Sequence, residues 1–375
     1  MNTLILDTSL TGHRLEYINY LYNGAKKRCE EHFIFAVPRN EWEKVREKRS
    51  WPDASNIQWL LLDDRECQEA SNGSMLARCL RTSKLIRRVA IEQRANKVKL
   101  ISIAGIIPIL PLILPSYIKL SGIIYEIYLR ANKSKIKRII DYFRYSVMAR
   151  NVSMGKVFIL NDPRSADKLN KIYHTNRFIP LVDPVPDLAA IKYCDMRKDL
   201  AIPEDAKVFL HFGAMDKRKG TIEILRAINL ITEPDLKNNY FIFAGQVGDN
   251  IRLEFYTLVD DLKSKGVNII IRDEFCSYEL LHSLCKTSDV ILIPYLLTDL
   301  SSGALGYAAL HNKPVIGPGS GLIGELINDN KLGITLQTIN PETLAKAFAA
   351  NLTFQGSEYA EKNAISSFTK TFLDS

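Results

Sequence analysis

The chain has 375 residues, too many for one ordinary hydrophobic core, which indicates two domains. Apolar residues make up 46% and charged residues 25%, a balance typical of a folded globular protein and not of a disordered one. The net charge of +8 favours anionic partners such as nucleotides, phosphorylated lipids or nucleic acid, without choosing among them.

The six cysteines include no C-x-x-C pair, and no Cys/His cluster has the spacing of metal ligands. This pattern predicts a protein of the reducing cytoplasm without a disulfide framework. The opening MNTLILDTSLTGHRLEY lacks the basic start and the cleavage site of a signal peptide. We expect it to begin with a buried strand.

The first half is predicted to alternate between short apolar strands and helices. The expected strands are 3–6, 32–37, 57–62, 100–103, 122–127 and 157–160, and the expected helices are 12–25 and 76–93. A further helix is expected after Asp162, because Pro163 suits a first helical position.

The apolar stretch 100–118, LISIAGIIPILPLILPSYI, approaches the length of a membrane span. Prolines at positions 108, 111 and 115 oppose a continuous helix, because each removes a backbone donor. We expect a buried strand followed by an irregular apolar loop. A loop that dips into a membrane surface is the alternative.

The second half alternates more clearly. The expected strands are 207–212, 240–244, 267–271, 290–294 and 314–317, and the expected helices are 221–231, 251–265, 278–287, 302–311 and 341–350. Apolar strands separated by helices indicate a parallel sheet covered on both faces. The sequence therefore predicts two Rossmann-like α/β domains, 1–183 and 184–352, divided near the two prolines of VDPVPD. For the tail 353–375, one interpretation is a last helix that crosses back to the first domain.

The loop GAMDKRKG, 213–220, follows the first strand of the second domain. Gly213 permits close backbone approach, Arg218 and Lys219 supply positive charge, and a helix N-terminus follows them. Fixed cations of this kind stabilise a departing nucleoside diphosphate. A solvated basic turn is the alternative interpretation.

The segment DLSSGALGY, 299–307, follows the strand VILIP. Ser301 and Ser302 suit a helix N-cap, and Gly303 lets a phosphate approach free backbone N–H groups. Asp299 offers a carboxylate to sugar hydroxyls, and Tyr307 follows two turns along the helix. A capped helix with a packed tyrosine is the alternative.

Two weaker candidates stand at other strand ends. The loop GPGSGLIG, 317–324, permits close backbone contact, although tight turns use glycine for many reasons. Gly12 and His13 follow the first strand and open a helix, where they offer an anion or sugar contact. A structural role for this lone histidine is the alternative.

Taken in order, the strand before G-x5-K-G, then FIFAG, DVILIPY, a Gly/Ser-opened helix and NKPVIGPGSGLIGELI resemble the retaining family-four glycosyltransferases of GT-B fold. The resemblance covers about residues 207–350. It implies two Rossmann-like domains whose parallel sheets face across a cleft. It also implies transfer of a sugar, with retention and without a metal, from a nucleotide-diphosphate sugar to a glycan or lipid-linked acceptor in bacterial surface-polysaccharide synthesis.

The family pattern implies roles for individual positions, and this sequence departs from the pattern at some of them. Arg218, Lys219 and Asp299 take the catalytic positions, whereas the usual arginine after the first glycine is Ala214 here. The family has a Glu-x7-Glu motif, and its second glutamate contacts the ribose. Tyr307 stands at that position here, so its phenol hydroxyl would have to make the ribose contact.

Other positions follow the family less closely. The loop from Arg272 to Phe275 is expected beside the nucleobase, and Glu126 or Tyr128 lies where the family often has a histidine. The departures keep two alternatives open, a non-catalytic GT-B-like scaffold and a GT-B sugar-nucleotide epimerase.

Basic residues gather in two expected helices of the first domain. They are Arg78, Arg81, Lys84, Arg87 and Arg88, followed by Lys133, Lys135, Lys137 and Arg138. Together with the apolar loop 108–115, they favour an anionic surface at the inner face of a membrane. Two solvated basic helices are the alternative. No nucleic-acid partner is expected, because no aromatic residues interleave with the charges.

Overall fold

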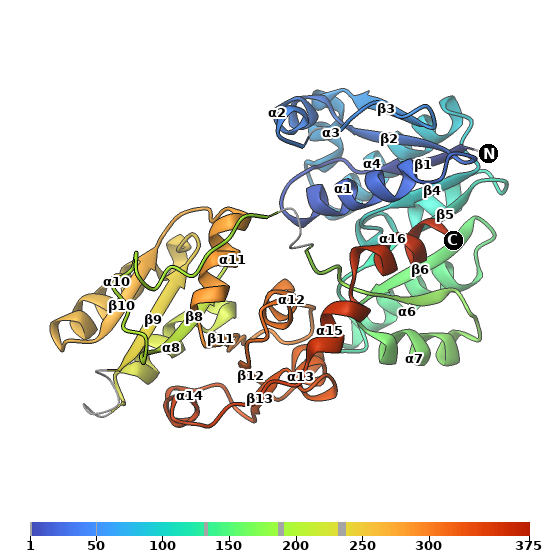
Figure 1. Cartoon of the computed structure of the whole chain (residues 1–375). Coiled ribbons are helices and arrows are strands. Elements are labelled where there is room, and N and C mark those ends of the chain that lie inside the picture. The colour runs from blue at the N-terminus through green and yellow to red at the C-terminus, as the bar shows by residue number, and fades with distance from the viewer. Residues whose placement is uncertain (1, 50, 131–133, 187–190, 232–237) are drawn as a thin grey trace. The chain divides into compact units, whose positions relative to one another are not determined.

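The computed structural model describes residues 2–49, 51–130, 134–186, 191–231 and 238–375. Lys133 lies outside these ranges. The chain divides into two compact units (Figure 1). Unit 1 comprises Met1–Val182 with Ile365–Ser375, and unit 2 comprises Asp183–Ala364.

Unit 1 contains a seven-stranded parallel sheet with the order β3-β2-β1-β4-β5-β6-β7 among the described residues. The strands are β1 (Asn2–Leu6), β2 (His32–Pro38), β3 (Ile57–Leu62), β4 (Lys97–Leu100), β5 (Lys119–Ile124), β6 (Met154–Leu160) and β7 (Phe178–Leu181). The chain runs outward from β1 to β3 and then returns to β4 on the other side of β1. The crevice between the ends of β1 and β4 is therefore the topological switch point, where such sheets bind ligands.

Helices cover both faces of this sheet. They are α1 (His13–Lys26), α2 (Arg39–Arg49), α3 (Asp64–Ser71), α4 (Met75–Glu92), α5 (Ile109–Ile113), α6 (Lys135–Arg150), α7 (Pro163–Tyr173) and α16 (Ile365–Leu373). The start of α7 is as predicted, with the Asp162 carboxylate accepting a hydrogen bond from the Ser165 N–H at 3.0 Å.

The last helix, α16, packs within unit 1 although unit 2 precedes it in the chain (Figure 1). The Phe368 ring lies 4.9 Å from that of Tyr17 on α1, and the Phe372 ring lies 4.9 Å from that of Phe158 on β6. The buried Lys99 ammonium donates to the Phe372 carbonyl at 2.6 Å. Of the tail 353–375, the helix α15 (Ser357–Lys362) stays with unit 2, and only the part from Ile365 joins unit 1.

The apolar stretch 100–118 differs from its prediction. The strand β4 ends at Leu100, where the prediction began it, and residues 109–113 form the short helix α5 in place of an irregular loop. Pro108 is tolerated because it precedes the helix, where a missing N–H breaks no helical hydrogen bond. Among the described residues, no helix is both long and apolar enough to span a membrane.

The strand predicted at 122–127 is also displaced, since β5 begins at Lys119 and ends at Ile124. The reason is pairing, because β5 aligns with β4 from Lys119 onward. Ile127 is buried but lies beyond the strand. The apolar run continues past Ile124, the last residue of β5, and for this reason the strand was predicted to end too late.

Unit 2 contains a six-stranded parallel sheet with the order β10-β9-β8-β11-β12-β13 among the described residues. The strands are β8 (Lys207–Phe212), β9 (Asn239–Ala244), β10 (Asn268–Arg272), β11 (Val290–Leu292), β12 (Val315–Pro318) and β13 (Gly333–Leu336). The larger helices are α8 (Thr221–Ile228), α10 (Asp249–Ser264), α11 (Tyr278–Thr287), α12 (Gly303–Leu310), α13 (Gly321–Asp329) and α14 (Pro341–Phe348). By the same reasoning as in unit 1, the switch point lies between β8 and β11.

Candidate functional site

Three loops meet at the switch point of unit 2. They follow β8, β11 and β12; the first two were candidates for phosphate or sugar binding, and the third was a weaker candidate for close backbone contact with a ligand. The Leu296 N–H donates to the Arg218 carbonyl at 2.8 Å and joins the first loop to the second. The Ile323 N–H, in the first turn of α13, donates to the Thr298 carbonyl at 3.1 Å and joins the second to the third.

Lys219 lies at the centre of this edge. Its ammonium donates to the Phe212 carbonyl at 3.4 Å, where β8 ends, and lies 5.2 Å from the centroid of the Tyr295 ring. A Cβ atom at Gly213 would stand 2.5 Å from the same ammonium nitrogen. The glycine therefore makes the room in which the half-buried lysine side chain lies.

Arg218 points to a different partner. Its Nε donates to the Asp216 carboxylate at 2.8 Å, and the other oxygen of that carboxylate accepts the Lys219 N–H at 3.2 Å. Asp216 thus caps the short 3₁₀ turn Lys217–Lys219 and holds the guanidinium within the loop. Ala214 is exposed beside them. Of the two predicted cations, Lys219 faces the strand end and Arg218 is paired at the surface.

Gly220 is required by the backbone at this position. Its φ is +68°, and a Cβ there would collide with the Pro294 carbonyl oxygen. We expect Gly220→Ala to destabilise unit 2 by at least about 1–2 kcal/mol, because left-handed strain adds to the collision. Chemical denaturation followed by far-ultraviolet circular dichroism measures this.

Gly303→Ala is the matched control, because a Cβ at Gly303 meets nothing within 4 Å in the first turn of α12. Its stability should equal or slightly exceed that of the wild type. Equal stability of both variants would contradict this account of Gly220.

The start of α12 is open as predicted. The Ser302 hydroxyl accepts the Ala304 N–H at 3.3 Å and so caps the helix, and Gly303 is exposed. The Ser301 hydroxyl donates to the Asp183 carboxylate at 2.8 Å. Asp299 lies half-buried two residues earlier in the same loop. The exposed Gly303 therefore leaves the backbone at the first residue of this helix accessible to solvent.

Tyr307 lies in the interior of unit 2, beside the last residue of β8. It is only 8% exposed, and its ring packs 5.5 Å from that of Phe212 and 4.8 Å from that of His282. His282 in turn forms a 2.9 Å hydrogen bond with His311. The side chain of Tyr307 therefore packs in the core of unit 2, as in the alternative of a capped helix with a packed tyrosine.

Arg272 is the last residue of the edge strand β10, and Phe275 lies in the loop that follows it. The Arg272 carbonyl accepts the Gly245 N–H at 2.8 Å, and its buried Nε has no hydrogen-bond partner among the described residues. Phe275 is 84% exposed. The adjacent Asp273 fixes the loop by accepting the Val247 N–H at 2.8 Å.

The predicted residues of unit 1 lie together at one part of its sheet edge. Gly12, with φ of +59°, precedes α1. His13 opens that helix, and its exposed ring stands edge-on to Tyr125 at 5.4 Å. Glu126 is exposed just beyond β5.

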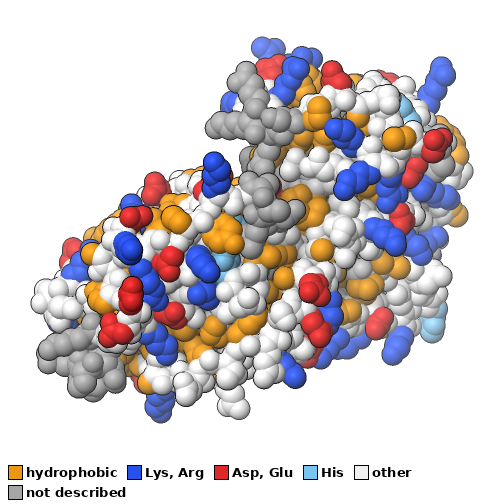
Figure 2. Space-filling view, in the orientation of Figure 1, with side chains coloured by type: hydrophobic (Ala, Val, Ile, Leu, Met, Phe, Trp, Pro, Cys, Tyr) orange, Lys and Arg blue, Asp and Glu red, His pale blue; other side chains and the backbone are white. Residues whose placement is uncertain are grey.

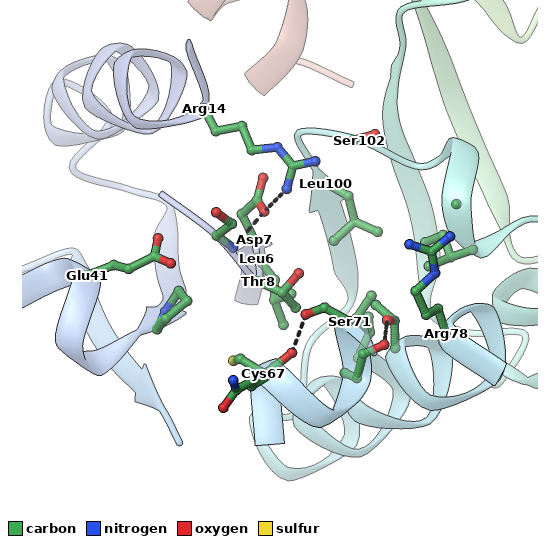
Figure 3. Close-up of a pocket in the computed structure, with 18 of the residues that line it drawn as sticks. Leu6, Asp7, Thr8, Arg14, Glu41, Cys67, Ser71, Arg78, Leu100 and Ser102 are labelled. Carbon is green, nitrogen blue, oxygen red and sulfur yellow. Dashed lines mark hydrogen bonds and ion pairs between the residues drawn. The ribbon is translucent and has the colours of Figure 1, made fainter. Parts of the chain in front are cut away.

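Sequence reasoning missed a pocket of about 790 Å³ in unit 1, at the switch point between β1 and β4. Figure 3 shows side chains from both strand ends and from α3 and α4 around it. Asp7, Arg14, Glu41, Arg78 and Ser102 are among its polar lining residues. A signal was present in the sequence, because Asp7 follows the buried strand TLIL directly at its carboxyl end.

Two doubly wound units, with a lysine loop and helix N-termini at the switch point of the second, define the GT-B class of fold. Residues 194–365, most of unit 2, match the family described as glycosyl transferases group 1. This match covers most of unit 2 but less than half of the 375 residues.

Solved structures agree with the class. HepE from Anabaena, crystallised with UDP, has a TM-score of 0.71 and 13% identity, over 100% of this chain and 99% of that one. A glycosyltransferase from Rickettsia africae has a TM-score of 0.63 and 16% identity, over 99% and 92%. WaaG, a glycosyltransferase involved in lipopolysaccharide biosynthesis, has a TM-score of 0.64 and 16% identity, over 100% and 95%. No curated protein matches the chain.

Proposed function

We propose that this protein transfers a sugar from a nucleotide-diphosphate donor to a glycan or lipid-linked acceptor, with retention and without a metal, in surface-polysaccharide synthesis. The observation that carries the proposal is the Lys219 ammonium beside the end of β8, at the switch point of a group 1 glycosyltransferase domain. HepE binds UDP and UDP-glucose, which makes uridine nucleotides the first donors to test.

The reaction breaks the bond between the sugar carbon and the diphosphate oxygen and forms one from the same carbon to the acceptor oxygen. The acceptor's proton ends on the released diphosphate, so no separate base is required. Negative charge grows on the leaving group, and Lys219 is the fixed cation placed to stabilise it. The N-termini of α8 and α13 add partial positive charge, and neither is capped by a side chain.

Other donor contacts follow from position. Asp299 accepts hydrogen bonds from the donor sugar, and the backbone at Ser301 and Gly303 contacts the phosphate. The exposed Phe275 ring and the Arg272 guanidinium contact the base. We assign no donor contact to Tyr307, because its side chain lies in the core.

The test is a thermal-shift series with UDP, GDP, ADP, CMP and their sugar conjugates. Saturation at 100 times the dissociation constant stabilises a folded protein by about 2.7 kcal/mol. We expect one nucleoside diphosphate to raise the melting temperature of the wild type and of Lys217→Ala, an exposed lysine in the same turn, but not of Lys219→Ala.

The alternatives predict other results. Absence of any shift with every nucleotide would contradict the proposal and favour a non-catalytic scaffold. Conversion of a nucleotide sugar to its epimer without an acceptor would favour the epimerase.

The membrane part of the proposal rests on the first half of α6. An apolar stripe on this helix is exposed, with Ile136 at 73% and Ile139 at 69%. The stripe continues through Ile140 and Phe143, and Lys135, Lys137 and Arg138 lie beside it. An exposed apolar face with cationic neighbours is typical of a helix that lies in an anionic membrane surface.

Two of the other predicted basic residues, Arg87 and Arg88, are already engaged within unit 1. Arg87 donates to the Ile113 carbonyl at 2.9 Å, and Arg88 is paired with Glu66 and Glu92. On the face drawn in Figure 2, Lys and Arg side chains are mixed with Asp and Glu side chains, so no single cationic field covers it. The proposed membrane contact therefore centres on α6.

We expect Ile136→Asp/Ile139→Asp to reduce flotation with vesicles containing anionic lipid by at least about tenfold, because burying each isoleucine contributes about 1.5–3 kcal/mol. Ile172→Asp on α7, also an exposed isoleucine of unit 1, is the control and should float like the wild type. Equal flotation of all three proteins would refute the membrane contact.

A further inference from the structure

The pocket of unit 1 contains a buried carboxylate, that of Asp7, with one oxygen that accepts no hydrogen bond from the described residues. Asp7 is 5% exposed, and its Oδ1 accepts both the Ser9 N–H at 3.1 Å and the Arg14 guanidinium at 2.9 Å. Its Oδ2 has no hydrogen-bond partner among the described residues. Leaving a buried polar atom unpaired is unfavourable, so such an atom in a native pocket indicates a missing donor.

Asp7 lies at the switch point of the sheet, where ligands of such folds bind. It follows the last residue of β1, and Ser102 stands just beyond the end of β4 on the other side of the crevice. Figure 3 shows Arg14 reaching Asp7 from α1, with the ends of β1 and β4 between it and the helices of the opposite wall. The pocket volume of about 790 Å³ suits a ligand of one or two rings.

The rest of the lining favours a hydroxylated ligand. Side chains with hydroxyl or amide groups surround the pocket; they are Thr8, Ser9, Asn40, Gln68, Ser71, Thr82 and Ser102. The other two carboxylates of the lining are already engaged with backbone N–H groups, Glu41 with that of Leu10 and Asp64 with that of Asn40. Asp7 is therefore the carboxylate left for a ligand donor.

Two cations of the lining have no side-chain partner among the described residues. Lys44 and Arg78 are exposed, and neither makes an ion pair or side-chain hydrogen bond with another described residue. Arg14, in contrast, is bound to Asp7. A ligand that satisfies both the buried carboxylate and these cations carries hydroxyl groups and an anionic group at different ends.

We propose that this pocket binds a hydroxylated ring bearing a phosphate, with Asp7 accepting a hydrogen bond from a ring hydroxyl and Lys44 and Arg78 contacting the phosphate. That this ligand is the acceptor of the transfer rests on the proposed function, whereas the binding itself does not. The ring phosphate is either a soluble sugar phosphate or the headgroup of a lipid.

The experiment is calorimetric titration of the full chain, without nucleotide, with glucose 6-phosphate and with inositol 1-phosphate. Glucose, inositol and inorganic phosphate are titrated in parallel, and vesicles of phosphatidylinositol in phosphatidylcholine test the lipid source. We expect at least one ring phosphate to bind the wild type more tightly than its unphosphorylated ring and than inorganic phosphate.

Variants separate the two contacts. Asp7→Asn and Asp7→Leu should weaken binding of the ring phosphate at least tenfold. Arg78→Gln should weaken binding of the phosphorylated ring and leave binding of the unphosphorylated ring unchanged. Lys84→Gln on the same helix lies outside the pocket lining and is the control.

Three outcomes would overturn the inference: no binding of any ring phosphate or phosphatidylinositol vesicle to the wild type, binding that the Asp7 variants leave unchanged, or binding of inorganic phosphate alone. Loss of UDP binding in Lys219→Ala, measured separately, reports on the proposed function. Failure of one proposal is therefore distinguishable from failure of the other.

Discussion

Replacing Lys219 by alanine is expected to lower kcat/KM for sugar transfer by at least about 10²–10³, the usual effect of removing one fixed group that stabilises developing negative charge. The fold should persist, because the ammonium makes one long hydrogen bond of 3.4 Å and an aromatic contact. Initial rates with the donor identified by the thermal-shift series measure the effect. Circular dichroism of the same preparation checks the fold.

Two controls sharpen this prediction. Lys217→Ala removes an exposed lysine of the same turn and should retain near-normal turnover. Lys219→Arg should also have low activity, because its larger guanidinium must enter the space beside Gly213 and the Tyr295 ring that the ammonium occupies. Near-normal turnover of Lys219→Ala would remove the central claim of the proposed function.

Replacing Asp7 by asparagine is expected to stabilise unit 1 at pH 7.5 by up to about 3 kcal/mol. Burial raises the pKa of Asp7 from 3.8 to about 6, against the opposing effect of the Arg14 guanidinium. Each pKa unit corresponds to about 1.4 kcal/mol. Asparagine keeps an oxygen for the Ser9 and Arg14 contacts but carries no charge to desolvate.

The pH dependence has a definite sign. Because the folded pKa of Asp7 is raised, its protonated form contributes stability that is fully present below about pH 4 and is lost as pH rises through about 6. The advantage of Asp7→Asn over the wild type should therefore shrink as pH falls from 7.5 to 4. Comparing the two proteins at each pH cancels other titrations, such as that of His211, whose pKa burial lowers to about 4.

Urea titrations followed by tryptophan fluorescence suit this measurement. All three tryptophans, at positions 42, 51 and 59, belong to unit 1, so the signal reports that unit alone. A difference between the two proteins that stays constant from pH 4 to 7.5 would contradict the assigned ionisation. The variant that is expected to gain stability is also the one expected to lose its ligand.

The apolar runs of the sequence predicted most of the architecture. Ile57–Leu62, Lys207–Phe212 and Tyr278–Thr287 have the bounds expected for them. A polar residue or glycine flanks each of these segments at every end except the one next to Ala206, so most of their ends are local properties. The helices α2 and α3 were missed, because neither carries a long apolar stripe. The strand β13 was missed as well, because GITL is short and only half-buried.

The candidate site was predicted in part for the same reason. Lys219, Gly213 and Gly303 were recognised because glycine and charge at a strand end have a local meaning. The Arg218 pairing with Asp216 and the burial of Tyr307 depend on which way a side chain points. For Tyr307 this direction is fixed by neighbours far away in the chain, such as Phe212, whereas for Arg218 it is fixed by the conformation of its own turn.

The sequence by itself determined two parallel α/β units and the loop that carries Lys219, because periodicity, glycine and charge act over a few residues. Tertiary structure alone decided that Asp7 is buried with one oxygen unpaired among the described residues, and that only the part of the tail from Ile365 joins unit 1. Burial and hydrogen-bond partners are properties of packing. They arise only when segments far apart in sequence, such as β1 and β4, come to lie side by side.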